Sequence, residues 1–524
     1  TEFDALEELS LVRGHLYNAG FLQPILKGQW DLGGNAFINY GRLYIDPDAS
    51  LRIKRSLTFL NLHKIRGHHL KLATKYTPWV PMTRQQPAVL QADVASLLTF
   101  YATAVSLATT FMEAGLIEER VLAGLKAVYP VLGGITNVGR LSVKGGEFYA
   151  TDIINHQKAT FKIAEDSKFV ISKFKNAGTA IIGQAAPDTN HYIPYLVNSS
   201  RFWCDSDLTL DRLKTASSSR IHLYNGQRLE IRSPFKLYGT VRAFDGLALK
   251  GTGENFGQLV LVRKAIDEKD VLNLIIEDKL INQGTLLSQA PLTISGKGKL
   301  ENHKTVEAPT LKLEVSAVQN DGLMNGDTVE IRNSLLDNTN GDVHAAEKAT
   351  IVTTQVKNNH GKIHASDNVF VQTADLNNEE GSISGLKVTT LYSLSPKFTN
   401  KGGEIGAKGR TDLNFKQSSS IEELGSLKGT QIYLRDQSVA QNLTILNGIF
   451  SAEKFISLIG GHLTGTNLEF QTPALYLQLS SWALNDQVHC ERTVWSCNPD
   501  QDVDFTHPYR TRGTFEIWWN NFRT

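Results

Sequence analysis

Four corner phrases decide the fold of this chain, and each places an Asn-rich, Gly-containing turn before a short strand. They read Asn340-Gly341-Asp342-Val343, Asn359-His360-Gly361-Lys362-Ile363, Asn378-Glu379-Glu380-Gly381-Ser382-Ile383 and Asn400-Lys401-Gly402-Gly403-Glu404-Ile405. Counted from Gly322, the successive glycines 341, 361, 381 and 402 follow at steps of 19, 20, 20 and 21 residues. Runs of alternating apolar and polar residues, such as 349–354 and 368–373, separate the turns. This period predicts one coil of a parallel β-helix per repeat.

Stacking explains why such a repeat is stable. A single coil cannot bury its inward side chains, but coils about 4.8 Å apart pair their backbone groups and stack Val, Ile and Leu in columns. We expect Asn and Gly to supply positive φ at the corners, and stacked corner Asn side chains to form hydrogen-bonded ladders. A β-sandwich or propeller is the alternative, but sandwich turns recur every 8–12 residues and propeller blades every 40–45.

The repeat extends through most of the chain, with one interruption. In the first half Asn137, Asn155, Asn176 and Asn198 follow one another at steps of 18, 21 and 22 residues. We therefore predict an all-β solenoid in four parts. These are N-terminal coils over 1–83, a helical insertion over 84–130, the main β-helix over 131–479 and an aromatic-rich cap over 480–524.

The interruption reads as an α-helical hairpin. Residues 88–128 are rich in Ala, Leu and Glu, Pro87 suits a helix start, and Gly115 suggests a turn between two helices. Residues 94–112 carry no charge and are long enough to cross a bilayer. Six Ser and Thr side chains in that stretch favour a helix packed against the β-helix instead, so membrane contact through 84–130 stays the alternative.

The C-terminal segment is where aromatic residues gather. An open end of stacked strands needs a cover, and aromatic side chains are suited to provide one. The alternative is a partner-binding surface, for which the candidate residues are Trp495, Trp518, Trp519 and Phe522. Cys490 and Cys497 would close a small loop in an oxidising compartment, worth roughly 2–3 kcal/mol, and two reduced thiols are the alternative. The third cysteine, Cys204, has no evident partner.

Composition excludes several classes of function. The chain has 524 residues, 41% of them hydrophobic, and a net charge of +1, which gives no electrostatic case for nucleic-acid binding. Three cysteines are too few for a disulfide scaffold or a Cys-rich zinc module. We find no nucleophile elbow, phosphate-binding loop or helical His-Glu-x-x-His motif, and predict neither a cofactor nor catalytic or metal-binding residues.

Pectin-degrading β-helix enzymes are the catalytic alternative for such a fold. The chain contains Arg52-Ile53-Lys54 and Arg66-Gly67-His68-His69, but in the wrong order for such hydrolases and without an Asp-Asp pair. Asp205-Ser206-Asp207 reads as a turn, and the acidic run 500–504 lacks the spacing of a defined Ca²⁺ loop. His156, His303, His360 and His364 read as solvated corner residues.

The repeats over about 280–410 resemble the haemagglutinin repeats of filamentous-haemagglutinin-like exoproteins. The resemblance lies in phrases such as Asp375-Leu376-Asn377-Asn378-Glu379-Glu380-Gly381-Ser382-Ile383-Ser384 and Val356-Lys357-Asn358-Asn359-His360-Gly361-Lys362-Ile363-His364-Ala365. That group includes two-partner-secreted adhesins and the stalks of contact-dependent growth-inhibition toxins. The resemblance implies a right-handed β-helix that is secreted or lies on the bacterial cell surface. The Asn-Pro-Asn motifs of the family's secretion domain are missing here.

These features predict a non-enzymatic adhesin or toxin-stalk segment. Such a protein displays a binding or effector region and contacts a protein or glycan receptor on a target cell, or another toxin component. The alternative is a β-helical polysaccharide lyase or hydrolase, or a tailspike-like depolymerase, with two acidic residues on one concave face.

Overall fold

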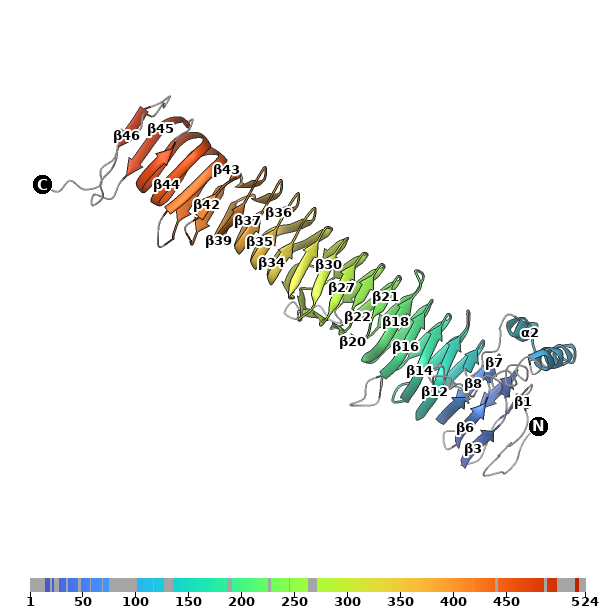
Figure 1. Cartoon of the computed structure of the whole chain (residues 1–524). Helices are drawn as coiled ribbons and strands as arrows, with labels where there is room; N and C mark the ends of the chain where they lie inside the picture. Colours follow the sequence, from blue (N-terminus) through green and yellow to red (C-terminus); the bar gives the residue numbers. More distant parts are fainter. Residues whose placement is uncertain are drawn as a thin grey trace, which may run out of the picture. The chain divides into compact units, whose positions relative to one another are not determined.

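The structure of the chain is a computed structural model. It describes residues 15–18, 21–22, 28–33, 36–45, 49–56, 58–67, 69–74, 101–115, 117–126, 135–185, 191–224, 228–244, 246–262, 271–417, 419–438, 442–484, 488–496 and 514–517. The chain divides into two compact units, unit 1 (residues 1–266) and unit 2 (residues 267–524). Strand accounts for 68% of the structure and helix for 6%, and the described strands form a parallel β-solenoid of about 17 turns (Figure 1). The predicted all-β solenoid is therefore confirmed.

In unit 1 each coil contributes strands to three faces, and every printed pairing between coils is parallel. The first face contains β1 (His15–Asn18), β4 (Ala36–Asn39), β7 (Thr58–Asn61), β10 (Ile135–Asn137), the ends of β12 (Glu147–Asn155), β14 (Lys168–Asn176), β16 (His191–Asn198) and β18 (Leu208–Thr215), then β21 (Phe235–Leu237) and β24 (Gly253–Asn255). The second face contains β2 (Phe21–Leu22), β5 (Arg42–Tyr44), β8 (Lys64–Gly67), β11 (Arg140–Val143), β13 (Thr160–Ile163), β15 (Thr179–Ile182), β17 (Arg201–Cys204), β19 (Arg220–Leu223), β22 (Thr240–Phe244) and β25 (Gln258–Val262). The third face contains β3 (Gly28–Gly33), β6 (Ala49–Ser56), β9 (His69–Thr74), the starts of β12, β14, β16 and β18, then β20 (Leu229–Ile231) and β23 (Leu247–Leu249).

Unit 2 has the same three faces, but several of its strands bend around a corner and serve two or three of them. Its first face contains β27 (Lys279–Asn282), β30 (Lys299–Asn302), β33 (Ala317–Asn320), the ends of β34 (Leu323–Asp337), β35 (Asp342–Lys357), β37 (Asn368–Asn377) and β39 (Val388–Thr399), and β42 (Ser419–Ile421). Its second face contains β28 (Thr285–Ser288), β31 (Thr305–Glu307), the starts of β34 and β35, β36 (Lys362–Ala365), β38 (Ser382–Gly385), β40 (Glu404–Ala407), and parts of β43 (Gly425–Asp436) and β44 (Asn442–Leu484). Its third face contains β26 (Leu272–Ile276), β29 (Leu292–Ser295), β32 (Thr310–Glu314), middle or starting parts of β34, β35, β37 and β39, β41 (Arg410–Phe415), and further parts of β43 and β44. Strands β45 (Val488–Ser496) and β46 (Thr514–Ile517) continue the parallel pairing after β44.

Apolar side chains stack inside the coils, as the alternation in the sequence predicts. On the second face of unit 2, for example, one inward column is fully buried and consists of Val343, Ile363, Ile383, Ile405, Leu427 and Phe450. Side chains on either side of this column point outward and are partly or fully exposed. The surface of each face is thus made of outward columns with one residue per coil.

Corner asparagines form the predicted hydrogen-bonded ladders. In unit 1 each side-chain amide donates to the next side-chain carbonyl at 2.7–2.8 Å, in the order Asn39, Asn61, Asn137, Asn155, Asn176 and Asn198. A second ladder in unit 2 joins Asn282, Asn302, Asn320, Asn338, Asn358, Asn378 and Asn400 at 2.5–2.8 Å. All of these side chains are buried. The ladders satisfy polar groups that would otherwise be costly inside the corner.

The predicted positive φ is confirmed at two corners, where Asn340 and Gly402 have φ of 59° and 62°, but other corner glycines have a different role. At three successive corners positive φ falls on the residue directly before the glycine, namely Asn340, His360 and Glu380, with φ of 59°, 54° and 52°. The following glycine is needed for close approach instead. A Cβ on Gly361 would lie 2.1 Å from the Asn338 carbonyl oxygen, a distance that no side chain tolerates. Gly is therefore required at position 361 because the backbone of the adjacent coil is so close, whereas the residue before it adopts the positive φ of the turn.

The helical insertion is present and packs on unit 1. Residues 101–113 are helical, Gly115 lies in the turn with φ of 70°, and α2 (Glu119–Lys126) follows (Figure 1). Both helices contribute to one apolar cluster with the solenoid, formed by Ile38, Tyr40, Leu60, Leu62, Ala104, Ala108, Ile117, Val121, Leu122 and Leu125. The Tyr40 hydroxyl donates to the Ala104 carbonyl at 2.7 Å. Pro87 and the predicted ends of the insertion lie outside the described residues.

Within the described part of the chain, no helix combines the length and the apolarity that a membrane crossing requires. Residues 101–112 belong to the uncharged stretch, and their small side chains Ala104 and Ala108 face the solenoid. The hydroxyl groups of Thr109 and Thr110 bond to the carbonyls of Val105 and Ser106, one turn earlier in the same helix. In the described part of this helix Thr103, Ser106 and Thr110 are exposed and Thr109 is partly buried.

Candidate binding surfaces

Most of the predicted site residues lie outside the part of the chain whose side chains the structure describes. Trp495 and Cys490 belong to β45 by their backbone, opposite Leu477 and Thr472 of β44. Cys497 lies outside the described residues, so the predicted disulfide is untested. The aromatic candidates Trp518, Trp519 and Phe522 also lie outside the described part of the chain.

The third cysteine is buried and free. Cys204 ends β17, is fully buried, and points its thiol at the Ser206 carbonyl at 3.4 Å. Burial raises the pKa of this thiol to about 12, so it stays protonated at physiological pH. The neighbouring Asp205-Ser206-Asp207 is a turn between β17 and β18, as predicted.

The predicted corner histidines divide into two groups. His156, His303 and His360 lie in turns between strands, as expected. His364 instead lies within β36, where its ring is 4.6 Å from that of His344 in the preceding coil. Partial burial, and more weakly His344 and Lys362, lower the pKa of His364, against the opposing effect of Asp342. Among the residues whose placement is described, no group of three or more His, Cys, Asp or Glu side chains is arranged to hold a metal ion.

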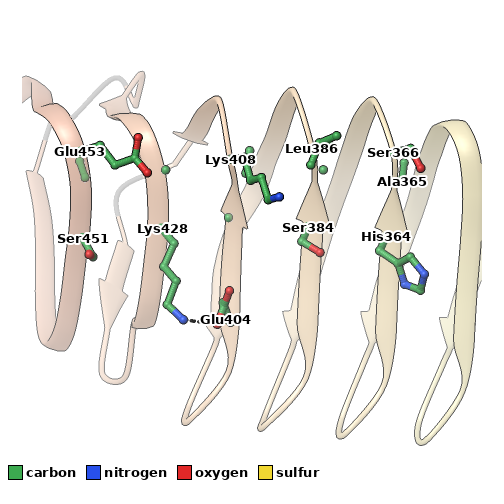
Figure 2. A pocket seen from close by; sticks show the side chains of 15 residues that line it. His364, Ala365, Ser366, Ser384, Leu386, Glu404, Lys408, Lys428, Ser451 and Glu453 are labelled. Atoms are coloured by element: carbon green, nitrogen blue, oxygen red, sulfur yellow. Dashed lines mark hydrogen bonds and ion pairs between the residues drawn. The ribbon is translucent and has the colours of Figure 1, made fainter.

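A groove of about 650 Å³ lies on the second face of unit 2, at its corner with the third face (Figure 2). The groove exists because the outward column runs from His364 through Ser384 and Gly406 to Lys428, so two small residues separate two large ones. Gly406 cannot carry a side chain without approaching the Lys428 carbonyl at 2.9 Å. The hollow is therefore a fixed feature of the outer surface.

The charged groups around this groove are mostly paired with one another. Lys428 bonds to Glu404 of the neighbouring coil at 2.5 Å, as Figure 2 shows, and Glu453 accepts a hydrogen bond from Thr430 at 3.0 Å. Leu386, 46% exposed, lies on the rim. The Lys408 ammonium makes no hydrogen bond or ion pair with any residue that the structure describes. The groove thus offers one unpaired cation beside an apolar side chain.

A second surface follows the third face of unit 2, and we call it the third-face strip. It consists of five partly exposed aromatic residues and two arginines that point outward from successive coils, namely Phe370, Tyr392, Tyr433, Phe455, Tyr476, Arg410 and Arg435. The rings of Tyr433 and Phe455 lie 5.4 Å apart and those of Phe455 and Tyr476 lie 5.5 Å apart, both edge to face. Edge-to-face pairs are a favoured arrangement of aromatic rings.

The two arginines hold the centre of the third-face strip. Their guanidinium groups lie 4.5 and 4.7 Å from the centre of the Tyr433 ring. Both also bond to the buried carboxylate of Asp412, at 2.7 Å from Arg410 and 2.8 Å from Arg435. The hydrogen bond to Asp412 raises the pKa of Arg410 above its ordinary value. Together the two arginines and Asp412 carry one net positive charge.

The sequence did not single out the third-face strip. Most successive members lie 18–23 residues apart along the chain, and Arg435 lies two residues after Tyr433. Only the register of the coils brings these side chains together in space. The available signal was the occurrence of aromatic residues at outward positions of alternating strands, as in Thr390-Leu391-Tyr392 and Ile432-Tyr433-Leu434. The core does not require aromatic residues at these positions, because their side chains point outward.

Comparison with protein-family models, curated proteins and solved structures gives no match for this chain. The solenoid fold is thus established by the structure, and membership of the haemagglutinin-repeat group stays a prediction.

Proposed function

We propose that this chain is a non-enzymatic β-helical adhesin or toxin-stalk segment of a secreted or surface-bound bacterial exoprotein, which contacts a target cell or a partner protein. The third-face strip carries this proposal. A parallel solenoid offers long, regular outer faces built from one residue per coil, and such faces are typical binding surfaces of repeat proteins. On most outward positions polar side chains are sufficient, so a run of partly exposed aromatic residues marks a contact surface.

The residue types in the third-face strip support binding. Tyr and Arg are enriched among the residues that dominate protein interfaces, because they bring large contact areas and several hydrogen-bonding groups. Here Tyr433 is held between two guanidinium groups and against Phe455, so little side-chain freedom remains to be lost when a partner binds. This preorganisation favours a recognition surface.

The state of nearby carboxylates supports a binding role over a hydrolytic one. Paired-carboxylate hydrolysis needs one carboxyl group as acid and another as base or nucleophile, both open to substrate. Asp412 is buried beneath two arginines, and Glu404 is bonded to Lys428. Asp412 is thus closed to substrate, and Glu404, although its side chain is 41% exposed, is held in an ion pair.

Cell binding tests the proposal. The full chain, labelled with a fluorophore, is incubated with panels of bacterial and animal cells and measured by flow cytometry. We expect binding to at least one cell type, and a loss of tenfold or more when Tyr433→Ala and Phe455→Ala are combined. Tyr238→Ala, which removes another exposed tyrosine but in unit 1, is the matched control and leaves binding unchanged.

Two results would overturn this function. One is the release of reducing sugar or unsaturated product when the chain is incubated with a panel of polysaccharides, which would favour the depolymerase alternative. The other is cell binding that survives the double substitution in the third-face strip while circular dichroism shows an intact fold.

A further inference from the structure

A second hollow, on the second face of unit 1, has a composition unlike that of any surface described above. Two outward columns meet there. One column runs along the strands through Lys162, Ile181, Trp203 and His222, and its register is fixed by the pairing of β13, β15, β17 and β19. The other lies just after these strands, at the corner, and contains Lys144, Ala164, Gly183, Asp205 and Tyr224. Each backbone N–H of Ala164, Gly183, Asp205 and Tyr224 bonds to the coil before it at 2.8–2.9 Å.

Small residues create this hollow. Ala164 and Gly183 occupy two consecutive places of the corner column, between Lys144 on one side and Asp205 and Tyr224 on the other, and the space above them has a volume of about 490 Å³. A Cβ on Gly183 would lie 2.7 Å from the backbone nitrogen of Glu165, so this floor position excludes any side chain. The Gly183 carbonyl is in turn bonded to the buried His191 ring at 2.9 Å, which fixes the floor.

An aromatic wall bounds one end of the hollow. Trp203 points outward between the buried residues Phe202 and Cys204, and its ring meets that of Tyr224 edge to face, at 6.4 Å and 84°. Tyr224 also contacts the His222 ring at 6.2 Å and remains 38% exposed. These contacts hold both rings in place while leaving part of their surface open to a ligand.

Unpaired polar groups face the aromatic wall. Lys144, Lys162 and Glu165 line the hollow, and within the part of the chain that the structure describes their charged ends form no hydrogen bond or ion pair. Asp205, which already has a partner elsewhere in the structure, is the second carboxylate of the lining, so the lining holds two ammonium and two carboxylate groups. A strongly charged ligand gains little from such a set, whereas a neutral ligand with many hydroxyl groups finds both donors and acceptors.

We propose that this hollow is a binding site for an uncharged pyranose oligosaccharide. One sugar ring lies with its apolar C–H face against the Trp203 indole, beside Tyr224. Its hydroxyl groups then donate to Glu165 and accept from Lys144 and Lys162. The volume falls within the range of small-ligand sites and accommodates a short oligosaccharide at an open surface. This site lies in unit 1 and does not depend on the third-face strip.

Saccharide titration of the full chain tests the site. Cellotetraose, maltotetraose, mannotetraose and chitotetraose serve as neutral probes and a sialylated trisaccharide as the charged probe, with isothermal titration calorimetry and saturation-transfer NMR as readouts. We expect at least one neutral probe to bind with a Kd in the micromolar to millimolar range. Trp203→Ala is expected to weaken that binding at least tenfold.

A filling variant keeps the test valid if removal of the indole harms folding. Ala164→Gln places a longer side chain into the hollow and leaves both aromatic rings in place, so it should also weaken the neutral probe at least tenfold. Tyr238→Ala in unit 1 and Tyr433→Ala in unit 2 are the controls and should bind as the wild type does. The second control also separates this site from the third-face strip.

Three results would overturn the proposal: no neutral probe binds, the charged probe binds better than every neutral one, or neutral binding survives both Trp203→Ala and Ala164→Gln in variants that remain folded. Cell binding that persists in Trp203→Ala is compatible with the proposal, because the third-face strip is a separate surface.

Discussion

Replacing one asparagine of the corner ladder tests how unit 2 is held together, and Asn338→Ala is the sharpest choice. Asn338 is fully buried in the middle of the ladder. Its carbonyl accepts from Asn320 at 2.7 Å. Its amide donates to Asn358 at 2.7 Å and to the backbone carbonyls of Lys362 at 3.0 Å and Gly341 at 3.2 Å. Alanine removes all four contacts but keeps the backbone geometry.

The expected cost follows from what the neighbours lose. The Asn320 amide keeps its bonds to the carbonyls of Gly322 and Asp342, at 3.1 and 3.3 Å, so it is not left without a partner. The side-chain carbonyl of Asn358 loses its ladder donor inside a buried corner. Net hydrogen bonds contribute about 1 kcal/mol each and an unsatisfied buried group costs roughly 1–3 kcal/mol. We therefore expect Asn338→Ala to lower the free energy of unfolding by about 2–4 kcal/mol.

Urea unfolding followed by circular dichroism measures the total loss, and hydrogen exchange with mass spectrometry locates it. Because each coil contacts mainly its neighbours, faster exchange should be confined to the coils around residues 320–380. Asn325→Ala is the matched control. It removes an asparagine from the outer surface of β34, the strand that ends directly before Asn338. The amide oxygen of Asn325 bonds to His344 at 2.8 Å, and its loss should cost less than about 0.5 kcal/mol.

A natural variation in unit 1 refines the expectation. After Asn198 the corner position is occupied by Thr215, whose hydroxyl accepts from the backbone nitrogens of Tyr238 at 2.8 Å and Gly239 at 3.4 Å. Threonine can thus supply part of the hydrogen bonding at a corner. Asn338→Thr should therefore lower the free energy of unfolding less than Asn338→Ala does. If Asn338→Ala and Asn325→Ala unfold at the same urea concentration, the ladder does not stabilise the corner and the reasoning is wrong.

Three further predictions concern charge, docking and close approach. Burial raises the pKa of Asp152 to about 6, above the unfolded value of 3.8, so its contribution to stability is fully present below pH 4 and is lost as the pH rises to about 6. In thermal melts, Asp152→Asn should be about 1–2 kcal/mol more stable than the wild type at pH 7.5, and its stability should change less over pH 4–6. An unchanged dependence of stability on pH would contradict this prediction. Leu125→Ala removes a fully buried side chain between the helices and the solenoid, at a cost of roughly 2–4 kcal/mol. Hydrogen exchange over 101–126 should therefore become faster, while coils 135–198 stay protected. Equal protection of 101–126 in Leu125→Ala and the wild type would show that other contacts hold the helices. Gly361→Ala should cost more than about 2 kcal/mol, because its Cβ would lie 2.1 Å from a backbone oxygen. Gly402→Ala, where φ is 62° and no atom lies nearer than 3.3 Å to the added Cβ, should cost about 1 kcal/mol. The reverse order of stability in urea unfolding would refute the close-approach argument.

The amino-acid sequence by itself determined the solenoid, its coil length and its corner ladders. Each coil meets the same demands as the next: a buried apolar column, a turn, and a partner for every corner amide. Those demands are local and recur, so the steps between Asn137, Asn155, Asn176 and Asn198 predict the ladder that the structure contains. The helical insertion was predictable for the same reason, because helix propensity and the turn at Gly115 are properties of short segments.

Only the tertiary structure decided which outward side chains meet. Coils differ in length by a few residues, so the residue that lies beside Tyr433 in the next coil depends on where each corner absorbs the difference. Arg410 and Arg435 meet across Asp412, and Trp203 meets Tyr224 beside the gap at Gly183, through register that no single segment of sequence encodes. The corner glycines show the same limit: their composition was visible, but the 2.1 Å approach that requires Gly361 arises only when one coil lies on another.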